Sequence, residues 1–106
     1  MTSERRSSPR IRILGTLHGY IVPLDVPVSV SEIGLGGMGI QTEIPFPVGT
    51  SHAFQLTLGD GSVVSLTGWV VHCRKMTEEG GERYLIGIRF TDNVPDAVAD
   101  LVDRLT

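Results

Sequence analysis

Three stretches of the chain alternate apolar and polar side chains with a two-residue period, which is typical of β-strands with one buried face. The first covers 26–33, the second 53–58 and the third 84–90. In the first stretch the valines fall on one face, and Ser29 and Ser31 fall on the other. The apolar faces consist of Val26, Val28 and Val30, of Phe54, Leu56 and Leu58, and of Tyr84, Ile86, Ile88 and Phe90. These patterns predict three half-buried strands.

The intervening segments predict further strands and their turns. Residues 11–22 permit a strand interrupted by Gly15 and Gly19, and 62–75 is long and rich in β-branched residues. Asp60-Gly61 is the usual pair of a tight hairpin turn. The prolines of 43–50 exclude a helix there, and 77–82 predicts a polar, glycine-containing loop. About six strands joined by short turns predict an all-β domain, either a barrel or a sandwich.

The end of the chain has a different period. Pro95 suits the first turn of a helix, and the acids Asp92 and Asp96 suit the positive end of the helix dipole. The apolar residues with helical spacing are Val94, Val98, Leu101, Val102 and Leu105. We predict one amphipathic helix over 94–105, packed on the sheet or across one mouth of a barrel.

Composition narrows the class of protein. A chain of 106 residues with 41% hydrophobic and 20% charged residues is expected to form one folded domain. Cys73, the single cysteine, can form no internal disulfide. No apolar run reaches the ~18 residues that span a bilayer, and no signal peptide is recognisable. We therefore expect a cytoplasmic protein without membrane insertion.

The basic residues are concentrated at the start of the chain. Four of the nine lysines and arginines lie in the first twelve positions, which contain one acid, Glu4. We treat 1–12 as an arginine-rich arm and 13–106 as the folded domain. The net charge of −3 argues against general binding of nucleic acid, which uses a broad basic face. Arginine presents a planar fork of donors that fits phosphate oxygens and the O6/N7 edge of guanine. The arm is either a ligand-binding segment for a small anion or a solvated terminus.

Four glycines fall within 34–39 and match the dinucleotide fingerprint GxGxxG. That fingerprint requires a helix that begins at the glycines, but here the chain runs on to Pro45 and Pro47. We reject a dinucleotide fold. In an all-β chain such a cluster predicts a bulge or a tight bend, at which another backbone or a ligand comes close.

Two motifs together resemble those of PilZ domains. Arg6-Ser7-Ser8-Pro9-Arg10 is similar to the RxxxR motif of that family. Glu32-Ile33-Gly34-Leu35-Gly36-Gly37 lies where the family carries D/N-x-S-x-x-G. The segments 48–50, 67–71 and 86–90 are similar to the later strands of the family, and the closing helix is in the expected place. The resemblance covers nearly the whole chain.

The resemblance implies a six-stranded antiparallel β-barrel with a C-terminal helix, which binds cyclic di-GMP and needs no other cofactor. It implies a non-catalytic receptor or adaptor that passes the signal to a protein partner, and it indicates no oligomeric state. The ligand-binding residues that it implies are Arg5, Arg6, Arg10, Glu32, Gly34 and Gly37.

The second motif departs from the family at two positions, because Glu32 replaces aspartate or asparagine and Gly34 replaces serine. A lost hydroxyl is worth roughly 1 kcal/mol where it made a hydrogen bond. Two functions stay open: a cyclic di-GMP receptor with weakened binding, and a degenerate domain that binds protein instead. A single-stranded nucleic-acid binder ranks behind both, because it would need a basic groove with stacking aromatic residues.

Catalysis and metal binding receive no support from the sequence. The histidines His18, His52 and His72 lie on different predicted strands and have no metal-ligand spacing. No nucleophile motif such as GxSxG is present. We expect Trp69 to pack in or beside the barrel.

Overall fold

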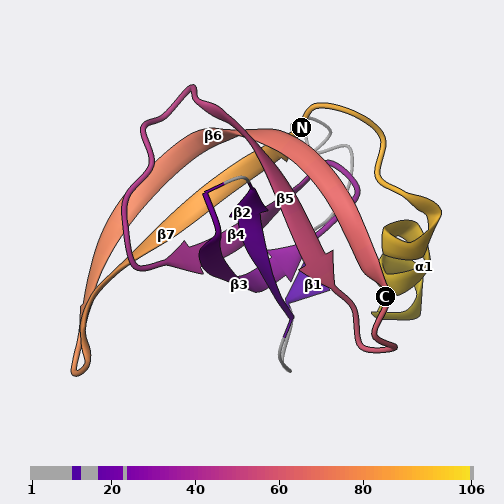
Figure 1. The fold of residues 1–106 in the computed structure, drawn as a ribbon, viewed down its shortest axis with the longest axis horizontal. Helices are drawn as coiled ribbons and strands as arrows, with labels where there is room; N and C mark the ends of the chain where they lie inside the picture. The colour runs from indigo at the N-terminus through magenta and orange to yellow at the C-terminus, as the bar shows by residue number, and fades with distance from the viewer. Residues whose placement is uncertain (1–10, 13–16, 23, 106) are drawn as a thin grey trace, which may run out of the picture.

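The computed structural model describes residues 11–12, 17–22 and 24–105. This part of the chain forms seven strands and one helix (Figure 1). In chain order they are β1 (Ile11–Arg12), β2 (His18–Val22), β3 (Val26–Ile33), β4 (Gly37–Thr42), β5 (Ser51–Thr57), β6 (Val63–Glu78), β7 (Gly81–Phe90) and α1 (Asp96–Leu105).

The strands close into a six-stranded antiparallel barrel, as expected. The sheet order is β1-β3-β2-β5-β6-β7-β4, and an additional pairing of β3 with β4 closes the ring. Because β4 occupies one edge of β3, β1 and β2 follow each other along the other edge, and together they act as one interrupted strand. The N–H of Val30 donates to the Leu17 carbonyl oxygen at 2.8 Å just before β2.

The barrel interior is filled by the apolar faces of the strands. Two cross-strand rows point inward on β3, β4, β7 and β6: Ile33, Met38, Ile88 and Val70, and next to them Val30, Ile40, Ile86 and Cys73. The predicted apolar faces of 26–33, 53–58 and 84–90 all join this core, with Val26 and Tyr84 partly buried. Burial of such aliphatic side chains stabilises the fold by about 1.5–3 kcal/mol each.

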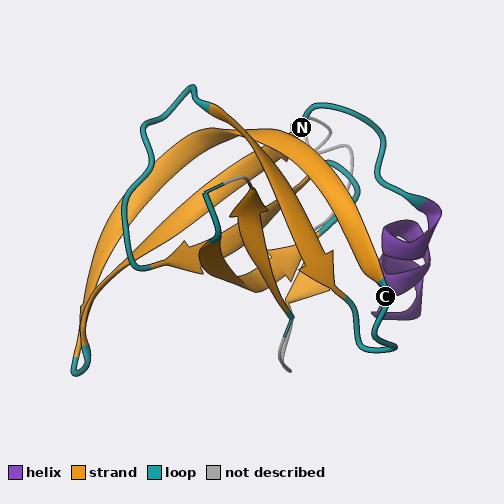
Figure 2. Cartoon of the chain, viewed as in Figure 1, coloured by secondary structure: helices purple, strands orange, loops and turns teal. Residues whose placement is uncertain are grey.

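The helix α1 closes one end of the barrel beside the β5–β6 turn (Figure 2). Val98 and Val102 are buried in the core, whereas Asp100 and Arg104 face solvent. The helix begins at Asp96, two residues later than expected, because the Pro95 carbonyl accepts the first bonds from the N–H groups of Val98 and Ala99. Asp96 lies in the first turn and Arg104 in the last, which suits the helix dipole.

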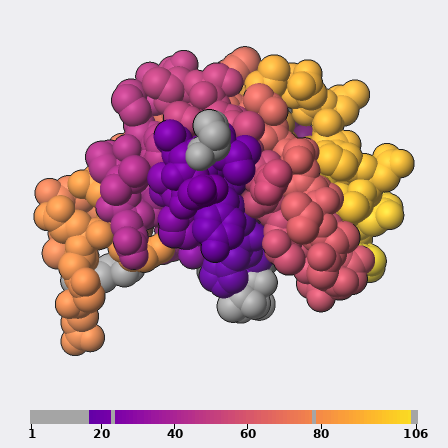
Figure 3. Space-filling model, viewed as in Figure 1, coloured from indigo at the N-terminus to yellow at the C-terminus, as the bar shows by residue number. Residues whose placement is uncertain are grey.

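The two hairpin tips differ. The β5–β6 turn is fixed by Asp60, whose Oδ1 accepts from the Ser62 N–H at 2.9 Å and from its hydroxyl at 2.6 Å, and Gly61 has a φ of 89°. The expected loop over 77–82 is instead mostly strand, because the β6–β7 ladder continues to Glu78 and Gly81. Lys75 and Glu82 form an ion pair of 3.0 Å across this ladder. The hairpin projects from the body of the barrel (orange in Figure 3).

Candidate ligand-binding site

The second motif forms a tight bend between β3 and β4. The N–H of Gly34 donates to the Gly37 carbonyl at 2.9 Å, and the Gly36 carbonyl accepts from the Phe90 N–H of β7 at 2.9 Å. Both Gly34 and Gly37 are buried. The bend expected from the glycine cluster is therefore present, and β7 holds it in place.

A bulge in β3 turns Glu32 toward the outside of the barrel. The register between β3 and β4 shifts between Val30, which pairs with Ile40, and Glu32, which pairs with Gly39. Ser31 is the extra residue. Strict alternation from Val30 would point Glu32 into the core, but the inserted residue leaves it half exposed and buries Ile33 instead. Bulges commonly re-aim side chains in this way beside binding sites.

The Glu32 side chain lies across Gly39 of β4. A Cβ atom at Gly39 would be 3.0 Å from both Cγ and Oε2 of Glu32, and 3.3 Å from the Ser31 hydroxyl oxygen. That hydroxyl donates to the Gly39 carbonyl at 3.1 Å. Because Gly39 has no side chain, the Glu32 carboxylate extends over its backbone. A larger residue there would displace Glu32.

The chain that follows the first motif runs beside this carboxylate. Arg5, Arg6 and Arg10 lie outside the described residues. In β1, however, Ile11 pairs with Ile33 and Arg12 pairs with Glu32. The residue directly after Arg10 is therefore the partner of the residue directly before Gly34. The β1–β3 pairing brings the end of the arginine arm to the second motif, although the two are twenty positions apart in sequence.

An exposed arginine of β7 adjoins the bend. Arg89 pairs with Gly37 on one side and with Trp69 of β6 on the other. Trp69 lies on the outer surface, with 39% of its area exposed, beside the barrel and outside its core. The sequence pattern predicts only a strand for Arg89, because its neighbours depend on the registers of β7 with β4 and with β6.

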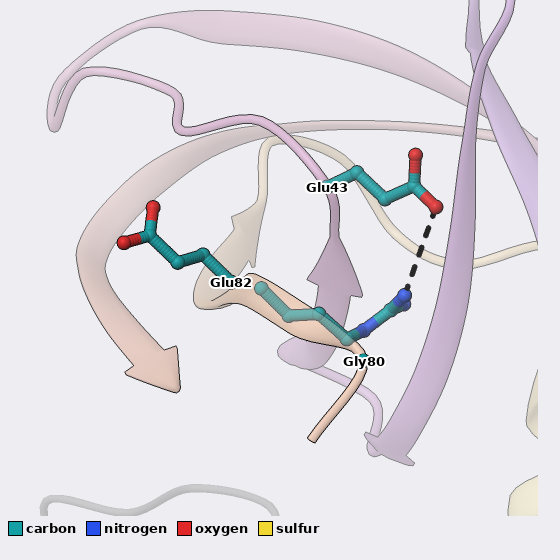
Figure 4. Close-up of a pocket in the computed structure, with 4 residues that line it drawn as sticks. Glu43, Gly80 and Glu82 are labelled. Atoms are coloured by element: carbon teal, nitrogen blue, oxygen red, sulfur yellow. Dashed lines mark ion pairs between the residues drawn. The ribbon is translucent and has the colours of Figure 1, made fainter. Parts of the chain in front are cut away.

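A separate pocket of about 500 Å³ lies near the tip of the projecting hairpin, lined by Glu43, Gly80, Glu82 and Arg83 (Figure 4). The dashed line marks the ion pair between Arg83 Nη1 and Glu43 Oε2, at 4.0 Å. The lining of the pocket contains two carboxylates and one guanidinium, so the pocket does not favour an anionic ligand. It adjoins the Thr42 end of β4, opposite the end that carries the bend.

The described residues contain no group of three or more His, Cys, Asp or Glu that could hold a metal ion. None of the helical structure described is long and apolar enough to cross a membrane.

Comparison with known proteins identifies the family. The PilZ domain model matches residues 4–106, which is nearly the whole chain and includes both motifs. The chain belongs to the PilZ domain family. No curated protein matches it. Among solved structures, the PilZ barrel is similar to the PilZ domain with c-di-GMP of YcgR from Escherichia coli, with a TM-score of 0.66 and 20% sequence identity. The match covers 94% of this chain and 87% of that one, which confirms the predicted fold.

Proposed function

We propose that this PilZ domain is a non-catalytic receptor for cyclic di-GMP. The observation that carries the proposal is the outward Glu32 carboxylate, which the β1–β3 register brings beside the chain leaving the RxxxR motif. The similar solved structure is described as the PilZ domain with c-di-GMP of YcgR, which supports the same ligand.

The chemistry of the ligand matches these residues. Cyclic di-GMP carries two phosphate charges and two guanines. In the proposal Arg6 and Arg10, assisted by Arg5, contact phosphate oxygens and the O6/N7 edge of guanine. Glu32 accepts from the N1 and N2 hydrogens of a guanine. The bend at Gly34 and Gly37 lets the ligand approach the backbone closely.

Substitution of the motif arginines tests these roles. Arg6→Ala and Arg10→Ala should each lower affinity for cyclic di-GMP by at least about tenfold, because each removes charge-assisted hydrogen bonds. Arg104→Ala, on the exposed side of α1, is the matched control and should bind as the wild type does. Circular dichroism should show the same melting temperature for all variants. Unchanged affinity in both motif variants would refute the assignment.

The departures from the family motif favour a second candidate, a PilZ barrel that has lost the nucleotide and binds a protein partner. Glu32 and Gly34 stand where the family carries Asp or Asn and Ser. This candidate predicts that the folded wild type gives no binding signal. A receptor acting as an adaptor would also need a protein partner, which it would contact in a ligand-dependent way.

A further inference from the structure

A second bulge lies across the barrel wall from the one at Ser31. The β6–β7 register shifts between Val70, which pairs with Ile88, and His72, which pairs with Gly87. Val71 is the extra residue. Strict alternation from the buried Val70 would turn His72 inward, but the bulge leaves its side chain exposed on the outer surface. A β-bulge therefore turns both Glu32 and His72 toward the outer surface.

The two re-aimed side chains belong to one cross-strand row, the glycine row. Glu32 pairs with Gly39, Gly39 with Gly87, and Gly87 with His72. The row crosses four neighbouring strands, and its two middle positions have no side chain. The inward rows on both sides of it are filled with core residues, so the glycine row faces outward. The backbone at Gly39 and Gly87 therefore forms a shallow floor between two side chains, those of Glu32 and His72.

Both side chains extend over this glycine floor. The Glu32 carboxylate extends over Gly39, as described above. The Nε2 end of the His72 ring lies over Gly87, where a Cβ atom would come within 2.6 Å of Cδ2 and 2.9 Å of Cε1. Cβ positions of directly opposite residues lie about 4.5–5.5 Å apart, so the carboxylate and the imidazole approach the same Gly39–Gly87 pair from opposite sides.

We propose that His72 contacts the ligand opposite Glu32 and stacks against the guanine whose edge Glu32 binds. This inference rests on the proposed function. A base held by Glu32 has to lie above the glycine floor, because the carboxylate extends over that floor. The other side of the floor is occupied by the imidazole. The Nε2 end of this ring lies over Gly87 and the residue is exposed, so a planar partner has access to the ring. Histidine is among the side chains on which nucleobases stack.

Four variants test the inference by titration with cyclic di-GMP. His72→Ala should lower affinity about five- to tenfold, at the lower end of what base stacking contributes. His72→Phe keeps a ring without the nitrogens and should stay within about threefold of the wild type. Gly87→Ala should lose at least as much as His72→Ala, because its methyl group displaces the ring and raises the floor. His18→Ala, an exposed histidine on β2, is the matched control and should not change affinity.

The outcomes separate this inference from the proposed function. A wild type that binds no cyclic di-GMP overturns both. A wild type that binds no more tightly than His72→Ala overturns the inference alone. Equal losses in His72→Phe and His72→Ala overturn the stacking role. Melting temperatures of the variants within about 2 °C of the wild type establish that changed affinity does not reflect unfolding.

Discussion

Two walls of the barrel use the same antiparallel pairing, yet only one departs from a regular register. In the regular wall, formed by β2, β5 and residues 63–69 of β6, every pairing continues without a shift. In the bulged wall, formed by β3, β4, β7 and residues 70–78 of β6, the register shifts twice. The outward residues differ as well: Gln55, Ser65 and Thr67 on the regular wall, against Glu32, His72 and Arg89 around glycines on the bulged wall.

The two register shifts of the bulged wall are features that closure of the barrel does not explain. The regular wall pairs and buries its apolar face by simple alternation. Each bulge on the other wall leaves one residue out of the ladder, at a cost comparable to a hydrogen bond, about 1 kcal/mol. Both departures turn a polar side chain toward the same pair of glycines. The bulged wall is therefore the part of the barrel at which we propose that the ligand binds.

The largest expected effect is on stability, and it distinguishes the glycines of the two walls. Gly68 of the regular wall packs against backbone, because a Cβ atom there would lie 2.5 Å from the Arg89 carbonyl oxygen. Gly68→Ala should lower the free energy of unfolding by about 3 kcal/mol, at the upper end of typical overpacking costs. Urea denaturation measures this.

Gly59→Ala is the control for that experiment, because a Cβ atom at Gly59 would meet nothing within 4 Å. It should stay within about 0.5 kcal/mol of the wild type. Gly87→Ala should also cost little stability, since its methyl group meets a side chain that can move. The comparison fails if Gly87→Ala unfolds the barrel while Gly68→Ala does not.

The second-largest effect is expected when the Glu32 carboxylate of the glycine row is removed. Glu32→Ala should lower affinity for cyclic di-GMP about 10- to 100-fold, because hydrogen bonds to a charged group are the stronger kind. Glu43→Ala is the matched control, since Glu43 is an exposed carboxylate outside the row. Calorimetric titration measures both. Equal affinities of the two variants would refute the role of Glu32.

How far the sequence reveals the site depends on the bulges. Alternation predicted the core faces of β3, β5 and β7 because each stretch is regular over several residues. It could not predict the outward position of Glu32, because nothing in the run from Val26 to Ile33 marks Ser31 as an extra residue. The same holds for His72, whose neighbours depend on the shift at Val71.

The motif resemblance, by contrast, predicts Glu32, Gly34 and Gly37 as ligand-binding residues without any knowledge of the register. It did not indicate Arg12, Arg89 or His72, which become neighbours of the motif only through strand pairing. The polar composition of 77–82 suggested a loop, yet cross-strand pairs such as Lys75 and Glu82 extend the ladder almost to the tip.

A smaller effect is expected when the bulged wall is made more like the family motif. Glu32→Asp combined with Gly34→Ser restores the family residues, and a regained hydroxyl contact would add roughly 1 kcal/mol, or about fivefold in affinity. Gly34 is not among the glycines with a positive φ, so serine suits its backbone. If the wild type does not bind, the restored motif should create binding. The absence of any gain would show that these two positions do not limit affinity.

The smallest effect concerns His52 of the regular wall. Burial lowers the pKa of His52 below its ordinary value of 6.5. Its ring lies edge-on to Phe46, at 4.9 Å between ring centroids, and bonds the Thr50 hydroxyl through Nε2 at 2.9 Å. The folded state therefore favours the neutral imidazole. This contribution to stability is complete above the unfolded pKa and is lost as pH falls through the folded pKa.

Thermal melts of the wild type and of His52→Gln at about pH 7.5 and about pH 5.5 measure this contribution. The wild type should lose more stability on acidification than the variant does. An identical change in both proteins would show that His52 does not contribute to the pH dependence. Affinity for cyclic di-GMP at about pH 7.5 should be the same in both, because His52 lies outside the bulged wall.

The most direct test of the account is calorimetric titration of the folded wild-type domain with cyclic di-GMP, with GTP as the control nucleotide. We predict selective binding of cyclic di-GMP with a dissociation constant on the order of micromolar or tighter, and no comparable heat with GTP. A folded protein that gives no heat at high ligand concentration would contradict the receptor function and would leave the bulged wall as a surface for a protein partner.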